Sequence, residues 1–178
     1  VCSSDLLEPM AASMVDFLAS EGVEGLGMLE VGGGVGAIEI ELFKHGVASA
    51  TNVELSSGYD VAASELADEE GVADRIERRI GDFVEMADEF ATTDIVLANK
   101  VVCCYPFMER MMSAFVSRTG RYLALVFPRE RWWVKAGLTL GQLWLRLRRC
   151  GFRAFVHPVD ERSEEHTSEL QSQFRISY

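Results

Sequence analysis

Short apolar stretches alternate along the chain with longer segments whose apolar residues recur every three or four positions. The short stretches are typical of β-strands, and the longer segments are typical of amphipathic helices. Strands are predicted at 27–31, 50–54, 75–80, 94–99 and 121–127. Helices are predicted at 7–21, 37–45, 59–70 and 106–117. Because the two kinds of element alternate, we expect an α/β fold with a doubly wound, mostly parallel sheet and helices on both faces.

The two ends of the chain differ in character from the part between them. The sequence from Arg162 onward resembles an in-frame translation of a sequencing adapter, and residues 1–6 resemble the complementary adapter end. We therefore expect residues 1–6 and 162–178 to be foreign to the natural protein, as a cloning scar would be. The natural domain is then 7–161, and its own C-terminus is expected to be missing.

Composition and charge restrict the classes of function. The chain has 178 residues, of which 48% are hydrophobic and 25% charged, which is ordinary for one folded domain. Its formal net charge of -11 argues against a nucleic-acid partner, because affinity for phosphate backbones comes from clustered Lys and Arg. No apolar run approaches the ~20 residues of a membrane span, and the start lacks a signal-peptide pattern. A cytoplasmic protein without a membrane span is expected.

The cysteines are Cys2, Cys103, Cys104 and Cys150. They contain no C-x-x-C pair, and two adjacent cysteines are poor joint ligands for one metal ion. We therefore predict no metal site and no disulfide framework, and we expect reduced thiols.

A glycine-rich segment lies between the first predicted strand and the helix that follows it. It runs Glu30-Val-Gly-Gly-Gly-Val-Gly36, and its glycines are Gly32, Gly33, Gly34 and Gly36. Glycines let the backbone turn sharply and let a ligand approach with no Cβ in the way, and the helix N-terminus beyond can face an anion. A plain tight turn between strand and helix is the alternative.

Glu54 strengthens the ligand hypothesis. It ends the second predicted strand about twenty residues beyond the glycines, where a carboxylate can accept hydrogen bonds from both hydroxyls of a ribose. Its neighbour Leu55 joins the candidate cofactor-binding residues. A solvated glutamate at a strand end is the alternative. A dinucleotide-binding oxidoreductase would show G-x-G-x-x-G, whereas this sequence has G-x-G-x-G.

Residues 23–128 resemble the class I S-adenosylmethionine-dependent methyltransferases, whose first motif is an acidic residue followed by x-G-x-G-x-G. Glu30–Gly36 fits this motif throughout. The resemblance implies S-adenosylmethionine as the cofactor and a sheet of strand order 3-2-1-4-5. It also implies that Glu54 binds the ribose, that Asp82 and Phe83 contact the adenine, and that Asn99 lies beside the methionine moiety. Asp82 also suits a helix N-cap, and both roles stay open.

The layout after the fifth strand is similar to that of magnesium-protoporphyrin methyltransferases. Those proteins have a helical insertion there, and residues 132–157 are expected to be such an insertion, covering the substrate. The β-hairpin that normally completes the methyltransferase fold has no counterpart before Glu161. We therefore expect the C-terminal hairpin strands to be missing.

The resemblance implies methyl transfer, which we expect to be directed to a small-molecule acceptor. The alternatives are a Rossmann-type NAD(P)-dependent oxidoreductase and a non-catalytic cofactor-binding module. A catalytic base is needed only if the acceptor must lose a proton, and the candidates are Tyr105 and His157. The sequence leaves open the acceptor, the catalytic residues and the oligomeric state.

Overall fold

The computed structural model describes residues 7–127. The predicted insertion at 132–157, the candidate His157 and both adapter-like ends therefore lie outside the described residues. The helices are α1 (Pro9–Glu21), α2 (Ala37–Lys44), α3 (Asp60–Glu69), α4 (Phe83–Met86) and α5 (Met108–Arg118). The strands are β1 (Gly27–Val31), β2 (Ser49–Glu54), β3 (Ile76–Ile80), β4 (Thr93–Asn99) and β5 (Thr119–Val126).

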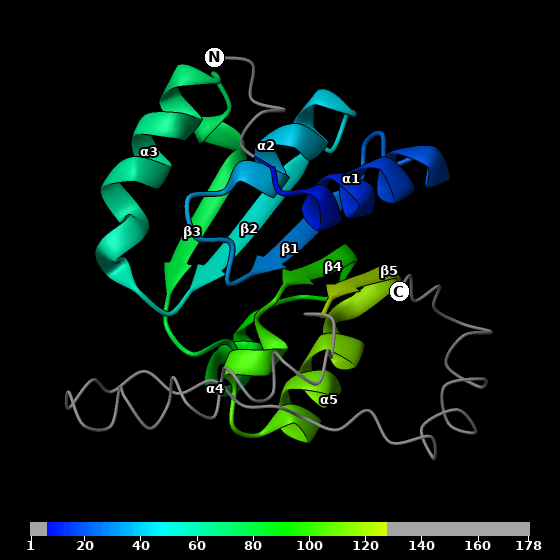
Figure 1. The fold of residues 1–178 in the computed structure, drawn as a ribbon, viewed down its shortest axis with the longest axis vertical. Coiled ribbons are helices and arrows are strands. Elements are labelled where there is room, and N and C mark those ends of the chain that lie inside the picture. Colours follow the sequence, from blue (N-terminus) through cyan, green and yellow to red (C-terminus); the bar gives the residue numbers. More distant parts are fainter. Residues whose placement is uncertain (1–6, 128–178) are drawn as a thin grey trace.

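The five strands form one sheet in which every described pairing is parallel (Figure 1). Their order is β3-β2-β1-β4-β5, so the predicted fold class and strand order are confirmed. The strands and helices predicted within residues 7–127 all occur, with bounds close to those expected. Helix α4 was not predicted, because its single turn is too short to show a helical period.

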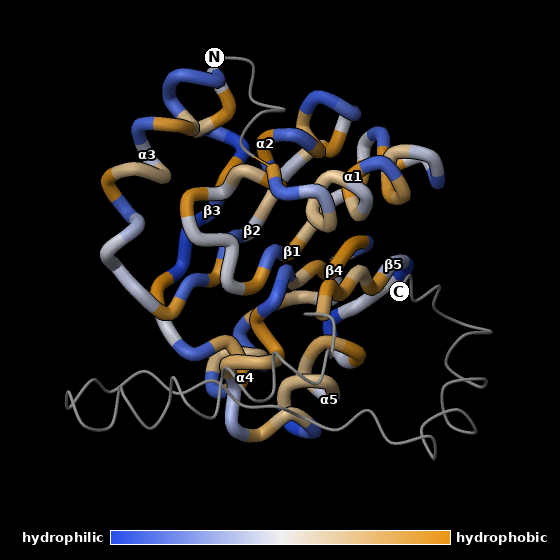
Figure 2. The backbone as a smooth tube through the Cα atoms, in the orientation of Figure 1, coloured by the Kyte–Doolittle hydropathy of each residue, from blue (hydrophilic) through white to orange (hydrophobic). Residues whose placement is uncertain are grey.

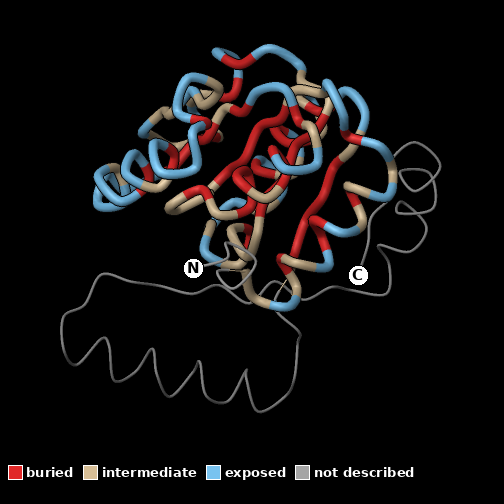
Figure 3. Tube along the Cα trace, turned by 90° about the horizontal axis from the view of Figure 1, so that it is seen from above, coloured by how far each residue is buried: buried red, intermediate tan, exposed pale blue. Residues whose placement is uncertain are grey.

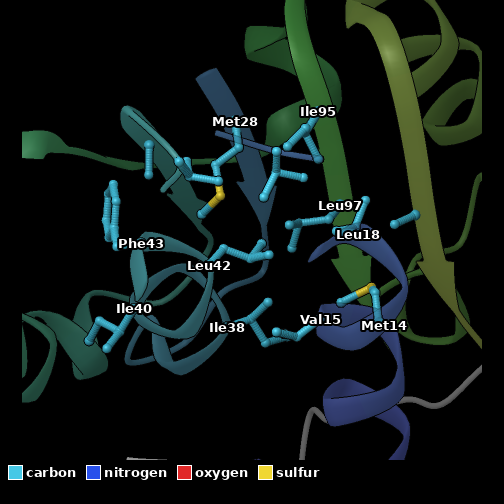
Figure 4. Close-up of a cluster of buried hydrophobic side chains, with 14 of the residues drawn as sticks. Met14, Val15, Leu18, Met28, Ile38, Ile40, Leu42, Phe43, Ile95 and Leu97 are labelled. Atoms are coloured by element: carbon cyan, nitrogen blue, oxygen red, sulfur yellow. The ribbon is translucent and has the colours of Figure 1, made fainter. Parts of the chain in front are cut away.

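Both faces of the sheet are covered, which explains why β4 is an almost continuous apolar run. Ile95 and Leu97 of β4 pack toward α1 and α2, in a cluster that Figure 4 shows with Met28 and Leu42. Val96 packs on the opposite face, in a second cluster covered by α4 and α5. The apolar and buried positions accordingly concentrate in the strands and on the inner sides of the helices (Figures 2 and 3).

The topology points to one edge of the sheet as the place for a ligand. Because all the strands are parallel, the loops that follow β1, β2, β3 and β4 meet at the carboxyl edge. The chain order reverses between β1 and β4, and open α/β sheets bind ligands beside such a switch point. The glycine segment follows β1 and Asn99 ends β4, so both lie at this point.

Within residues 7–127, none of the helices combines the length and the apolar character that a membrane span requires.

Candidate functional site

The glycine loop, residues 32–36, is shaped by contacts on its inner side. Gly32 begins it by donating its N–H to the Val53 carbonyl, at 2.7 Å. A Cβ on Gly32 would clash with the Val101 side chain, and one on Gly33 would lie 2.8 Å from Cδ of Glu30. A Cβ on Gly34, in contrast, would meet nothing within 4 Å. The loop is therefore packed tightly against the protein at its start and is open to a ligand at Gly34.

Glu54 ties the end of β2 to this loop. Its carboxylate accepts hydrogen bonds from the Gly34 N–H and from the Ser56 N–H, both at 3.0 Å, and the residue is only 8% exposed. A carboxylate offers about four acceptor positions, so two remain for a ligand. Leu55, the next residue, is 71% exposed at the same edge. The structure thus brings Glu54, Leu55 and Gly34 together.

Asp82 performs the N-cap role that its position also suited. Its carboxylate accepts a hydrogen bond from the Val84 N–H at 2.9 Å and so begins α4. The Tyr105 hydroxyl, from the segment after β4, donates to the same carboxylate at 3.1 and 3.3 Å. Burial, reinforced by Asp82, raises the pKa of Tyr105, so the phenol keeps its proton and acts as a donor.

Phe83 is placed differently from the other candidates. Its side chain is 3% exposed and its ring stacks on Phe115 of α5, with ring centroids 5.3 Å apart. In this structure it belongs to the hydrophobic core beneath Asp82, and its ring does not line the open edge.

The end of β4 carries a second polar group. The Asn99 side-chain amide donates to Glu8 at 3.3 Å, and the Lys100 ammonium forms an ion pair with the same carboxylate. The hydrogen bond from Lys100 lowers the pKa of Glu8. Lys100 has φ +57°, an uncommon conformation for a residue with a side chain and one that concentrates at functional sites. Sequence reasoning identified Asn99 but missed Glu8 and Lys100.

A row of polar side chains lies beneath the glycine loop. The strand register places Glu30 beside Asn52 and Asn52 beside Arg78, on β1, β2 and β3. Glu30 shares its sheet face with Met28, which packs toward α2, and a Cβ on Gly33 would clash with the Asn52 side chain. Glu39 completes the row from α2. We call these four residues the buried polar row, although Arg78 is only partly buried and also forms an ion pair with Asp60.

The pKa values of the two carboxyls of the buried polar row are both raised. Burial raises the pKa of Glu30 well above its usual value, and the nearby charge of Glu39 raises it further. Burial raises the pKa of Glu39 to about 7, although Asn52 and Arg78 both lower it. Glu30 is 1% exposed and lies under Gly33, so in this structure it touches the inner side of the loop and not its open side.

Most of the sequence-predicted residues gather at the carboxyl edge. Glu54, Leu55, Asp82 and the glycine loop follow neighbouring strands there, and Asn99 ends the adjacent strand across the switch point. In the described part of the chain, no group of three or more His, Cys, Asp or Glu side chains is arranged to hold a metal ion.

Comparison with solved structures relates this architecture to known proteins. Magnesium protoporphyrin IX methyltransferase (ChlM) from Synechocystis PCC 6803, solved with bound SAH, aligns with a TM-score of 0.67 and 24% identity over 84% of this chain and 66% of that chain. A proposed sarcosine dimethylglycine methyltransferase from Galdieria sulphuraria aligns with a TM-score of 0.60 and 20% identity, over 91% and 71%. A proposed RNA methyltransferase, PH1948 from Pyrococcus horikoshii, aligns with a TM-score of 0.51 and 21% identity, covering 59% of this chain and 53% of that chain.

These similarities establish the fold. The chain has the class I methyltransferase fold that the sequence resemblance predicts, and it spans 66% of the ChlM chain. No protein-family model and no curated protein sequence matches it. At these identities the fold is what the chain shares with the solved proteins, and the reaction must be argued from its own residues.

Proposed function

We propose that this protein binds S-adenosylmethionine at the carboxyl edge of its sheet and transfers the methyl group to a small-molecule acceptor. The observation that carries the proposal is the pairing of Glu54 with the Gly34 N–H beside open space. It places a carboxylate with free acceptor positions directly beside a loop that a ligand can approach. A solved protein of the same fold holds SAH, the demethylated product of this cofactor.

The residues present suit the groups of the cofactor. The remaining acceptor positions of Glu54 fit two ribose hydroxyls, and exposed Leu55 offers an apolar surface to an adenine ring. Asp82 can accept a hydrogen bond from the adenine amino group beside Tyr105. Gly34 leaves room for close approach, and Asn99 lies across the switch point on the side proposed for the methionine moiety.

The cofactor, when bound, supplies an electrophilic methyl group on a sulfonium. The protein's task in such a displacement is to position donor and acceptor in line, which can contribute several kcal/mol. Tyr105 suits positioning better than proton abstraction, because its hydroxyl already donates to Asp82 and its pKa is raised. We therefore propose that Tyr105 holds Asp82 in place and is not a general base.

The charge of the chain supports a small-molecule acceptor. A formal net charge of -11 disfavours the polyanionic backbone of a nucleic acid. ChlM, which shares the fold, is named for a porphyrin acceptor. The site's polar groups at the end of β4, Asn99 and Lys100, would face such an acceptor or the methionine end of the cofactor.

Calorimetric titration of the full chain with S-adenosylhomocysteine tests the proposal. We expect micromolar binding that is abolished in Glu54→Ala and retained in Glu65→Gln, an exposed carboxyl on α3. NAD should give no heat, because the glycine spacing does not match a dinucleotide loop. Failure of the folded protein to bind S-adenosylhomocysteine would refute the proposal. Binding of NAD instead would support the oxidoreductase alternative.

A further inference from the structure

Two adjacent thiols lie in the short turn that joins β4 to Tyr105. Cys103 and Cys104 belong to a single 3-10 turn, Val102–Cys104, and their Sγ atoms are 3.6 Å apart. Both thiols are directed at one acceptor, the Lys100 carbonyl, at 2.9 Å from Cys103 and 3.9 Å from Cys104. Both cysteines are free, and Cys104 is exposed. Closing the pair would shorten the distance between the sulfur atoms by about 1.5 Å. Because consecutive Cα atoms are closer together than those of an ordinary disulfide, closure also requires the backbone of this turn to change.

The same turn sets the position of Tyr105. The Cys104 N–H donates to the Val101 carbonyl at 2.9 Å, and the Tyr105 N–H donates to the Val102 carbonyl at 3.2 Å. Tyr105 follows Cys104 directly, and its hydroxyl reaches Asp82. A change in the Cys103–Cys104 backbone therefore acts within one residue of the side chain that holds Asp82.

We propose that Cys103 and Cys104 are a reversible oxidation site, and that closing them to a disulfide moves Tyr105 away from Asp82 and weakens cofactor binding. The first half of this inference depends only on the geometry of the thiol pair. The second half rests on the proposed function, because it takes Asp82 to be a contact of the cofactor.

A small-molecule disulfide such as glutathione disulfide supplies the oxidising equivalents. The Cys104 thiolate attacks one sulfur of the reagent, forms a mixed disulfide and releases one thiolate. The Cys103 sulfur then attacks Sγ of Cys104, forms the intramolecular bond and releases the second thiolate. The two protons lost by the cysteines pass to the two released thiolates, so two protein thiols are oxidised while one disulfide is reduced.

The order of attack follows from the surroundings of the two thiols. Burial, together with the contact to Cys104, raises the pKa of Cys103 to about 11, so Cys103 remains a thiol at neutral pH. Cys104 is the exposed member of the pair and is accessible to the reagent. The exposed thiol therefore reacts first, and the Cys103 step is expected to be the slower one and to accelerate as the pH rises.

The experiment uses the full chain with Cys2→Ser and Cys150→Ser, so that only the pair remains. The protein is fully reduced or treated with glutathione disulfide, and the reagent is then removed. Mass spectrometry of the peptide that contains both cysteines should show the loss of two hydrogens and no retained glutathione. Titration with S-adenosylhomocysteine should show roughly tenfold weaker binding after oxidation, as expected for the loss of one hydrogen bond to a charged group.

A second measurement does not depend on the cofactor. The Val84 amide donates to Asp82, so its hydrogen exchange should quicken when Tyr105 moves away. The control is Cys104→Ser in the same background, in which glutathione disulfide should change neither the exchange rate nor the affinity.

The outcomes separate the two proposals. Failure of the pair to close, or equal affinity and equal Val84 exchange in both redox states, would overturn the switch. Absence of S-adenosylhomocysteine binding by the reduced protein would count against the proposed function alone. Faster Val84 exchange on closure would still support the coupling of the thiols to Asp82.

Discussion

Replacing Glu39 with Gln should make the protein more stable at neutral and alkaline pH. Glu39 is 3% exposed and lies beneath the glycine loop, where burial raises its pKa to about 7. A protonated carboxyl and a carboxamide have nearly the same shape, and both can donate a hydrogen bond. Glu39→Gln therefore mimics the protonated form that the folded protein prefers, and it cannot ionise.

The magnitude follows from the difference in pKa between the folded and unfolded states. Unfolded Glu39 loses its proton near its ordinary pKa of 4.5, whereas the folded protein retains it up to a pKa of about 7. Between these values the folded state binds more protons, so stability falls as the pH rises, and the loss is complete above pH 7. A difference of about 2.5 pH units at about 1.4 kcal/mol each gives a loss of roughly 3 kcal/mol.

Urea unfolding of the full chain, followed by circular dichroism at several pH values, measures this difference. We expect the free energy of unfolding of Glu39→Gln to match that of the parent near pH 4. It should exceed the parent value by about 1–3 kcal/mol at pH 8, the lower figure allowing for imperfect hydrogen bonding of the amide. Glu65→Gln, on the exposed side of α3, should show no such gain. A Glu39→Gln variant that is equally or less stable than the parent at pH 8 would refute the reasoning.

Three further predictions follow from the contacts described above. Gly33→Ala should lower the free energy of unfolding by about 1–3 kcal/mol, because its Cβ clashes with Asn52. Gly34→Ala should lower the free energy of unfolding by about 1–2 kcal/mol and should abolish calorimetric binding of S-adenosylhomocysteine. Tyr105→Phe should weaken that binding roughly tenfold while changing the melting temperature little, since it removes one hydrogen bond to Asp82. Phe115→Ala should lower the free energy of urea unfolding by about 3–5 kcal/mol, because it empties the centre of a buried cluster.

The fold could be predicted because its signals are local. Strands β1, β4 and β5 are short, mostly apolar runs, β3 alternates apolar and charged residues in part, and the glycine or charged segments between the strands mark the connections. The alternation of strands with helices then leaves few topologies other than a parallel sheet. Helix α4 was not predicted because a single turn is too short to show a helical period. Asp82 in front of it was nevertheless identified as a possible N-cap.

The candidate site could be predicted only where it depends on strand ends. Glu54 ends β2 and Asp82 lies just beyond β3, and parallel strands end at one edge of a sheet. The order of the strands alone therefore implies that these two residues lie near each other. The contact between Tyr105 and Asp82 joins residues 23 positions apart and depends on the course of the turn after β4. Glu8 and Lys100 form an ion pair although they lie 92 positions apart in the sequence, and no sequence pattern predicts such a pairing.

The buried polar row could not be predicted from the sequence, because it depends on the register of the strands in the sheet. Glu30, Asn52 and Arg78 are unremarkable singly, and they form a row only because the register aligns them on one sheet face. The available signal was a polar residue in the middle of a strand that is buried at its carboxyl end, and Asn52 is such a residue. Glu30 belongs to the motif that the resemblance assigns to cofactor binding, and the structure places its carboxyl group directly beneath Gly33.

The glycine loop is therefore constrained from two sides for different reasons. On its inner side, Gly33 must be glycine because the side chains of Glu30 and Asn52 occupy the space of a Cβ. On its outer side, Gly34 leaves space that nothing in the described chain fills, and its N–H is fixed by Glu54. The glycine motif thus meets a packing requirement at Gly33 and leaves room at Gly34 for the proposed cofactor. Because the pKa values of both inner carboxyls are raised, we expect the shape of the loop to depend on the ionisation of Glu30 and Glu39.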